Sequence, residues 1–399
     1  MTHEKMSRQE LILVLNCGSS SIKFALFDTA KSPLPRAPVW NGKVQGIGGE
    51  QPDFGETGVA PFPVTLDETH PYRSALAMIL RHMRTRLGDG HLMAVAHRVV
   101  HGGSKYSTPV RIDAAALEDL RGYIPLAPLH QPFALEAIEI LLRERPDLPQ
   151  IACFDTAFHY TMPQVEQMLP LPYGAWERGL RRYGFHGLSY EYLSIALPER
   201  HGDMAHGRVI AAHLGSGASL CALHGLCSQA TTMGFSALDG LMMGTRTGSL
   251  DPGAVLYLME IERLSLQEVG RILYHESGLK GVSGISADPR ELLAAEADSP
   301  RARLALDLYV QRVVREVGAL TSVLGGLDML VFTAGIGEHN ATLRQRICDR
   351  LAWLGIRLNA QANAAHATTL SAADSSVLVA MEPTNEEWIA ARHAYRLVA

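Results

Sequence analysis

Cysteines are few in this sequence, and no pattern joins them. Five cysteines are scattered along 399 residues, and none belongs to a C-x-x-C pair. An odd number without such spacing argues against a disulfide framework and against a thiolate zinc site. Scattered, reduced thiols are typical of a cytoplasmic protein, and cytoplasmic is the location we expect.

Long apolar runs and clusters of basic residues are absent as well. After the polar start MTHEKMSRQE, the first apolar run covers only residues 11–15, and no later run approaches membrane length. That is too short for a signal peptide or a transmembrane helix, so we expect no membrane partner. The formal net charge is -5 and no Lys/Arg block occurs, which argues against a nucleic-acid partner.

The bulk composition is that of a globular α/β protein. The chain is 47% hydrophobic and 19% charged, and 399 residues exceed one typical core, so two domains are expected. A strand, a glycine turn and a returning strand occur at residues 11–28 and again at residues 208–223. This weak self-similarity predicts two domains of the same topology that face each other.

The spacing of apolar residues and the positions of glycine, proline and capping residues predict most of the remaining helices and strands. Strands are expected at residues 92–100, 151–154, 329–332 and 377–380, and helices at 72–87, 113–122, 132–145 and 300–324. Asp113 has the position of a helix N-cap. Thr384 and Glu387 have capping-box spacing and predict the start of a last helix. Glu386 is left without a capping role, and beside phosphates it could hold Mg²⁺.

Three glycine-containing segments could bind phosphate groups. They are NCGSSSIK at residues 16–23, HLGSGAS at 213–219 and AGIGEH at 334–339. Glycines let backbone N–H groups approach an anion, and Lys23 adds charge, although the Walker A spacing is absent. Each segment alone is also compatible with an ordinary turn or loop, but their recurrence in equivalent places favours function.

Five charged or titratable residues stand out by their setting. Arg98 in AHRVVHGG and Arg246 in MGTRTG follow apolar stretches, and a planar guanidinium suits a carboxylate or a phosphoryl group. Asp155 directly follows an apolar strand, while His186 lies between glycines and His130 lies in LAPLH. The alternatives are a salt bridge for each arginine, a turn cap for Asp155 and ordinary buried positions for the histidines.

Taken together, these segments resemble the acetate kinase family. The matching stretches are NCGSSSIKF, AHRVVHGG, LAPLHQP, FDTAFH, YGFHGLSYEY, HLGSGASL, MGFSALDGLMMGTRTGSLDPG, VSGIS, VFTAGIGE and PTNEE. The resemblance covers nearly the whole chain. It implies an α/β fold with two similar lobes of the actin-like ATPase (ribonuclease H-like) type and an ATP cleft between them. Residues 1–154 plus 385–399 would form the N-terminal lobe, and residues 155–384 a C-terminal lobe for nucleotide binding and dimerisation.

The resemblance also implies an activity and its residues. Mg·ATP would phosphorylate acetate directly, in line and reversibly, giving acetyl phosphate and ADP. Asn16 and Glu386 would hold Mg²⁺, with Mn²⁺ as an alternative ion. Arg98 and His130 would bind the substrate, and the catalytic residues would be Asp155, His186 and Arg246. The ATP contacts would be Lys23, His213, Leu214, Gly215, Ser216, Gly217, Asp288, Pro289, Arg290, Gly335, Ile336, Gly337, Glu338 and His339.

Three departures from the family pattern concern the nucleotide. Ser216 and His339 stand where the family has Asn, and Pro289 stands where an aromatic residue is frequent. Two other functions stay open at this point. One is a propionate or butyrate kinase of the same family, because a one-methylene difference discriminates by only about 1–3 kcal/mol. The other is an actin-like or chaperone-type ATPase without a small-molecule acceptor.

Overall fold

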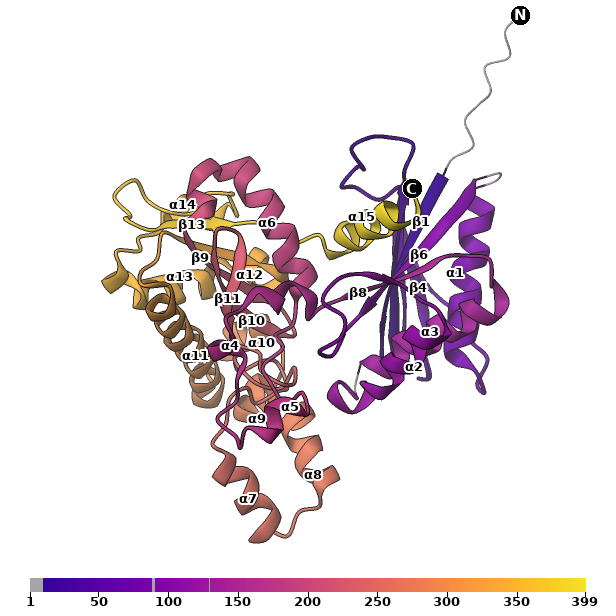
Figure 1. The fold of residues 1–399 in the computed structure, drawn as a ribbon. Helices are drawn as coiled ribbons and strands as arrows, with labels where there is room; N and C mark the ends of the chain where they lie inside the picture. The colour runs from indigo at the N-terminus through magenta and orange to yellow at the C-terminus, as the bar shows by residue number, and fades with distance from the viewer. Residues whose placement is uncertain (1–9, 88–89, 129) are drawn as a thin grey trace, which may run out of the picture. The chain divides into compact units, whose positions relative to one another are not determined.

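A computed structural model describes residues 10–87, 90–128 and 130–399 (Figure 1). The chain forms two compact units. The N-terminal unit comprises the residues up to Ala157 together with Asn385–Ala399, and the C-terminal unit is Phe158–Thr384. The first crossing therefore lies slightly after the expected boundary at 154/155, and the second lies at 384/385.

The N-terminal unit is built on an eight-stranded sheet of order β5-β4-β3-β2-β1-β6-β8-β7. Its strands are β1 (Glu10–Gly18), β2 (Ser21–Asp28), β3 (Trp40–Gln45), β4 (Asp53–Glu56), β5 (Val59–Pro63), β6 (His91–Val99), β7 (Val110–Arg111) and β8 (Gln150–Phe154). Its α-helices are α1 (Pro71–Leu87), α2 (Ala114–Gly122), α3 (Gln131–Glu144) and α15 (Glu386–Val398). The predicted helices at 72–87, 113–122 and 132–145 are thereby confirmed, as is the Asp113 cap, which accepts a hydrogen bond from Ala116 N.

The first hairpin is tighter than the sequence predicted. We expected a turn from residue 16 onward, but β1 continues to Gly18 and only Ser19 and Ser20 form the turn. Asn16 therefore lies within the strand, directly opposite Lys23 on β2. The apolar alternation of β1 runs through Cys17, which is buried in the core, and this extends the strand past Asn16.

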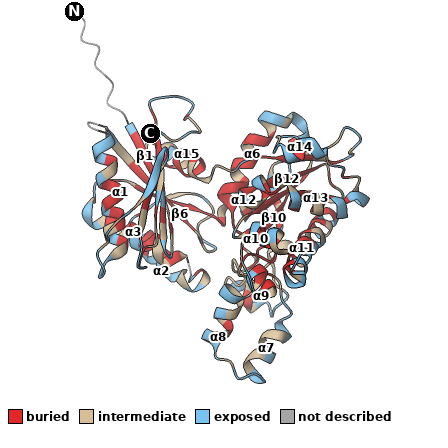
Figure 2. Cartoon of the chain, turned by 180° about the vertical axis from the view of Figure 1, so that it is seen from behind, coloured by how far each residue is buried: buried red, intermediate tan, exposed pale blue. Residues whose placement is uncertain are grey.

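Two helical layers cover this sheet. Leu11, Leu13 and Leu15 on one face of β1 join the core beneath α1 and α3. The last helix, α15, packs against β1, β6 and β8 and lies on the other face from α1 (Figure 1). Buried residues gather in the strands and on the sheet-facing sides of these helices (Figure 2).

The start of α15 corrects one prediction. Its N-cap is Asn385, whose side chain accepts a hydrogen bond from Trp388 N at 3.0 Å, so the capping box of Thr384 and Glu387 is wrong. The Asn385 amide also donates to Arg36 O at 2.9 Å, which fixes this side chain at the helix start. Glu387 is therefore not part of a capping box at the start of α15.

The C-terminal unit is built on a five-stranded sheet of order β11-β10-β9-β12-β13. Its strands are β9 (Arg208–Leu214), β10 (Ala218–His224), β11 (Cys227–Thr231), β12 (Met329–Thr333) and β13 (Leu378–Met381). Its α-helices are α4 (Gln164–Gln167), α5 (Gly174–Glu177), α6 (Gly187–His201), α7 (Pro252–Glu260), α8 (Leu266–Arg271), α9 (Gly278–Ser283), α10 (Pro289–Ala295), α11 (Pro300–Leu324), α12 (Ala334–His339), α13 (Ala341–Arg350) and α14 (Ala360–Ala364).

The two sheets share one topology, as predicted. In the first, β3, β2 and β1 are antiparallel and β1, β6 and β8 are parallel. In the second, β11, β10 and β9 are antiparallel and β9, β12 and β13 are parallel. The segment after β12, a predicted phosphate-binding segment with an ordinary loop as the alternative, is the short helix α12. Within the described residues, no helix has the length and apolar character needed to cross a membrane.

Two buried histidines make the stability of the N-terminal unit depend on pH. His97 bonds Gln150 Oε1 through Nε2 at 2.7 Å, and both His97 and His101 are almost fully buried. Burial lowers the pKa of each histidine to about 4. As the pH falls, these histidines therefore take up protons in the unfolded chain before they do so in the folded unit. Proton uptake then favours the unfolded chain, so the two histidines lower the stability of the folded unit at lower pH.

We predict that each of these histidines by itself contributes a decrease of about 2 kcal/mol to the free energy of unfolding of this unit between pH 7 and pH 5. Urea unfolding measured across this range checks the prediction. His97→Gln should remove the part of this decrease that His97 causes. His70→Gln, at an exposed histidine, is the control and should leave the decrease unchanged. A His97→Gln variant whose unfolding free energy changes between pH 7 and pH 5 as much as that of the wild type would contradict the assigned role of His97.

Candidate active site

A buried charge cluster lies in the N-terminal unit where β6 and β8 end. Because these strands are parallel neighbours, their carboxyl ends bring Arg98 beside Asp155. Arg98 Nε lies 2.9 Å from Asp155 Oδ1 and Nη2 lies 2.7 Å from Oδ2. Arg98 Nη1 also lies 3.0 Å from Oε2 of Glu386, in the first turn of α15. The guanidinium is thus clamped between two carboxylates from two elements.

The cluster carries more negative than positive charge. Burial raises the pKa of Glu386 to about 7; Arg98 and Lys23 oppose this shift, and the neighbouring Asp155 and Glu387 add to it. The main cause of the raised pKa is burial. The excess of negative charge follows from the contacts, because the single Arg98 guanidinium pairs with two carboxylates, Asp155 and Glu386. A cation bound at this point would relieve the excess.

The residues present fit a hydrated divalent ion better than an all-protein metal cage. Asn16 alternates with the core-facing Leu15 and Cys17 and so lies on the sheet face that carries α15 and Glu386. Among the described residues, no group of three or more His, Cys, Asp or Glu could hold a metal ion. Mg²⁺ needs no such group, since it keeps waters and takes one or two carboxylates plus substrate phosphates.

A second cluster, in the C-terminal unit, contains two stacked histidines. The rings of His186 and His213 lie 4.0 Å apart and are nearly parallel at 14°. His186 precedes α6 in the left-handed conformation (φ 60°), and His213 belongs to β9. Ser219 Oγ lies 2.8 Å from His186 Nδ1, and Ser189 Oγ lies 2.9 Å from His213 Nδ1. Serine hydroxyls therefore hold one edge of each ring.

The other edges of these rings lie near the glycine turn between β9 and β10. A Cβ placed on Gly217 would lie 3.3 Å from His186 Nε2 and 3.7 Å from Arg246 Nη1. A Cβ on Gly215 would lie 3.9 Å from His213 Nε2. Burial lowers the pKa of Arg246, yet a guanidinium stays charged at neutral pH. Ring nitrogens of two histidines, a cation and exposed backbone converge here, which suits an anion.

The three segments predicted to contact ATP in this unit meet in one cavity of about 460 Å³. The cavity is lined by Gly215, Ser216, Ala287, Asp288, Pro289, Arg290, Gly335, Ile336, His339 and Asn340. Apolar Ile336 and Pro289 beside polar Arg290 and His339 give it the character of a small-molecule site.

Several predicted ATP residues support this cavity without lining it. Leu214 is buried in β9. Glu338 Oε1 accepts hydrogen bonds from Ala334 N and Thr384 N, and the carbonyls of Gly337 and Glu338 accept from Arg344 Nη1. Their role is to fix the backbone around the glycines of α12.

The local geometry of two further predicted residues is clear. Asp288 caps α10 by accepting from Arg290 N at 2.8 Å, and its carboxylate pairs with the Arg290 side chain at 2.6 Å. His130 precedes α3, and its ring does not cap that helix. The assignments of Asp288 to ATP and of His130 to the substrate stay predictions.

The residues that hold the catalytic candidates in place were not among those predicted from the sequence. Tyr190 Oη lies 2.6 Å from Ser219 Oγ and extends the chain that reaches His186. Arg344 is almost fully buried and bonds Asn363 as well as the α12 carbonyls. Two signals could have found the serines: Ser189 lies one turn after His186 on a helix, and Ser219 is the polar residue opposite His213 in an apolar hairpin.

Comparison with known proteins decides the family. The sequence model of the acetokinase family matches residues 11–392. The chain belongs to the acetokinase family. An acetate kinase of Rhodopseudomonas palustris is 48% identical over 394 residues, which cover 97% of this chain and 98% of that protein. An acetate kinase of Rhizobium meliloti is 44% identical and covers 98% of this chain and 99% of its own length.

Solved structures of family members share the fold over nearly the full chain. The acetate kinase of Porphyromonas gingivalis superposes with a TM-score of 0.87 at 35% identity, covering 98% of this chain and all of that one. A propionate kinase of Francisella tularensis gives 0.88 at 35% identity, covering 96% and 98%. The chain thus has the two-domain actin-like ATPase fold of these kinases, as predicted.

The Arg98 clamp makes a testable prediction about stability. Arg98→Met would leave the Asp155 and Glu386 carboxylates buried without their cation, and breaking a buried pair in this way costs about 3–5 kcal/mol. The loss should be smaller at pH 5 than at pH 7.5, because the uncompensated carboxylates take up protons. Urea unfolding at both pH values measures it.

The control for this measurement is Arg121→Met on α2. Arg121 is exposed and pairs with Glu118 and Glu139, so its removal should cost much less. Equal losses for the two variants would show that the Arg98 cluster is not a buried charge clamp.

Proposed function

We propose that this chain is an acetate kinase that transfers the γ-phosphoryl group of Mg·ATP to acetate, reversibly and directly. The observation that carries the proposal is Arg98, a largely buried guanidinium held in place by Asp155 and Glu386. A fixed planar fork suits a small carboxylate substrate. The 48% identity to an acetate kinase along nearly the entire chain supports acetate as that substrate.

The chemistry needs charge neutralisation more than a base. A free carboxylate is ionised at neutral pH, so the nucleophile needs no deprotonation. Both carboxylate oxygens of Asp155 face Arg98, which suits Asp155 to orient the arginine. The difficulty is the approach of two anions, and we assign Arg98 to the acceptor and Arg246 with His186 to the phosphoryl group.

We assign Asn16 and Glu386 to the metal, as Mg²⁺ or Mn²⁺, because both lie on the same side of the sheet and two carboxylates there share one guanidinium. The ion would spread charge from the phosphates. The cavity beside Ile336 and Pro289 would take the adenosine, and the glycine turns with Lys23 would approach the phosphates. The family's nucleotide contacts are altered at Ser216, Pro289 and His339, so nucleotide preference is best measured directly.

Trapping of the acyl phosphate with hydroxylamine tests this function. Purified protein, ATP and Mg²⁺ are incubated with formate, acetate, propionate or butyrate, and the hydroxamate is measured. We predict the highest kcat/KM with acetate and lower activity with propionate. A higher kcat/KM for propionate would favour the second candidate, a propionate kinase, which the similarity to the Francisella protein supports equally in fold. Absence of hydroxamate with every acid would refute both.

Arg246 should act chiefly in the transition state. Arg246→Ala is expected to lower kcat at least about a hundredfold with little change in the KM for ATP, because its charge is needed where negative charge develops. Arg290→Ala is a matched control on the rim of the nucleotide cavity and should change the KM for ATP more than kcat. A near-normal kcat in Arg246→Ala would contradict the assigned role.

We further propose a cytoplasmic homodimer formed through the C-terminal unit. No disulfide joins the five cysteines, all of which are described, in keeping with a reducing compartment. Leu256 and Tyr257 on α7 and the following Ile261 are each more than half exposed, and no residue of α7 is buried. An apolar helix without a covering layer suits an interface with a second copy.

The dimer proposal is checked by light scattering after size-exclusion chromatography. Leu256→Asp with Tyr257→Asp should convert the protein from a dimer to a monomer. Val165→Asp places a carboxylate at an exposed apolar residue on α4 and should leave the dimer intact. A wild-type protein that is monomeric at micromolar concentration would refute the proposal.

A further inference from the structure

A row of polar residues crosses the N-terminal sheet beyond the charge cluster. Asn16 on β1 is directly opposite Lys23 on β2, which is opposite Lys43 on β3, which is opposite Gly55 on β4. Directly paired residues point to the same face of a sheet, here the face that carries α15. Neighbouring strands lie about 4.8 Å apart, so the row extends from Asn16 outward through two lysines.

The two lysines are not explained by sheet stability. Like charges directly opposite each other on antiparallel strands are destabilising. Lysine is common on edge strands, where it prevents aggregation, but β3 lies inside the sheet between β2 and β4. Both side chains are exposed, and within the described part of the chain neither forms an ion pair. A pair of this kind is better explained by an anionic ligand.

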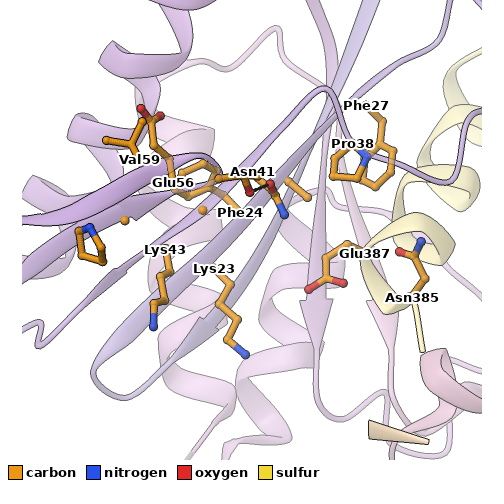
Figure 3. A pocket seen from close by; sticks show the side chains of 15 residues that line it. Lys23, Phe24, Phe27, Pro38, Asn41, Lys43, Glu56, Val59, Asn385 and Glu387 are labelled. Carbon is orange, nitrogen blue, oxygen red and sulfur yellow. Dashed lines mark hydrogen bonds between the residues drawn. The ribbon is translucent and has the colours of Figure 1, made fainter. Parts of the chain in front are cut away.

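The lysines border a cavity of about 430 Å³ that lies wholly within the N-terminal unit. Lys23 and Lys43 project side by side along it, and Glu387 lies at its α15 side (Figure 3). Phe27, Val59 and Pro61 contribute an apolar surface. Glycine at position 55 leaves the place beside Lys43 without a side chain. The size is within the range of about 300–1,000 Å³ that is typical of small-molecule sites.

The balance of charge in this cavity favours an anion close to the lysines. Glu56 also lines it, but its carboxylate is engaged by Arg86 and by the Trp40 indole. Glu387 is therefore the opposing charge, and it lies across the cavity in the first turn of α15. Glu386, on which Lys23 also acts, is not among the lining residues. Among the residues that line the cavity, two lysines therefore oppose one unengaged carboxylate, and the β2–β3 side has a net positive charge.

We propose that this cavity is a binding site for a small organic phosphate. Lys23 and Lys43 bind the phosphate group, and the organic part packs on Phe27, Val59 and Pro61. The site goes beyond the proposed acetate kinase reaction, but it shares Lys23 with the predicted ATP-phosphate contacts. A bound organic phosphate therefore competes for Lys23 and lowers the affinity of the N-terminal unit for nucleotide phosphates.

The test is a binding titration that does not depend on activity. Phenyl phosphate and inorganic phosphate are titrated separately into the full-length protein and followed by ³¹P NMR. We expect Lys43→Met to weaken phenyl phosphate binding at least fivefold, and Lys43→Arg to retain it. Glu387→Gln should strengthen it. Lys31→Met, at an exposed lysine outside the cavity, should leave the dissociation constant unchanged.

Two outcomes overturn the proposal. If Lys43→Met binds phenyl phosphate as the wild type does, the lysine pair is not a phosphate site. If inorganic phosphate binds as tightly as phenyl phosphate, and Val59→Ser weakens neither, the apolar surface does not select an organic phosphate. If the proposed acetate kinase function is wrong, no hydroxamate forms, but the results of these titrations do not change. The two proposals can therefore fail independently.

Discussion

The charge cluster of the N-terminal unit depends on holding one largely buried, charged arginine between carboxylates. Removing ions from water is costly, and the cost is recovered only with good geometry and complete hydrogen bonding. Arg98 meets this condition through Asp155 at the end of β8 and Glu386 at the start of α15. The last residues of the chain belong with the first 157, because α15 packs its buried side on β1, β6 and β8 and also supplies the second carboxylate of the clamp.

The C-terminal unit uses the same sheet topology for a different chemistry. Its glycine turn follows β9, as the first hairpin turn follows β1, but two stacked histidines and Arg246 take the place of the carboxylates. Serine hydroxyls fix the rings, and Arg344 fixes the backbone of α12 beside the nucleotide cavity. The N-terminal unit thus places carboxylates around the Arg98 guanidinium. The C-terminal unit places two histidine rings and Arg246 beside a glycine turn that could bind an anion.

Much of this could be predicted from sequence because it rests on local pattern. Apolar alternation and glycine punctuation gave the strands and most helices, and Arg98, Asp155 and His186 stood out by their neighbours. Two local predictions were wrong because neighbouring residues compete for the same role. Asn385, not Thr384, caps α15, and Asn16 is part of strand β1 and not of the turn.

The supporting contacts could not be predicted for a different reason. Tyr190 and Ser219 are far apart in sequence, and Arg344 looks like an ordinary helix arginine until its burial is known. The lysine row likewise exists only through the register of three strand pairs. Such contacts depend on tertiary pairing, which a single sequence does not display.

The central claim is that the clamped Arg98 fork receives the substrate carboxylate. It is tested most directly by measuring the KM for acetate and the KM for ATP in Arg98→Lys, which keeps the charge but loses the planar fork. We expect the KM for acetate to rise at least about tenfold and the KM for ATP to change less than about threefold. An unchanged KM for acetate, or equal changes in both, would contradict it.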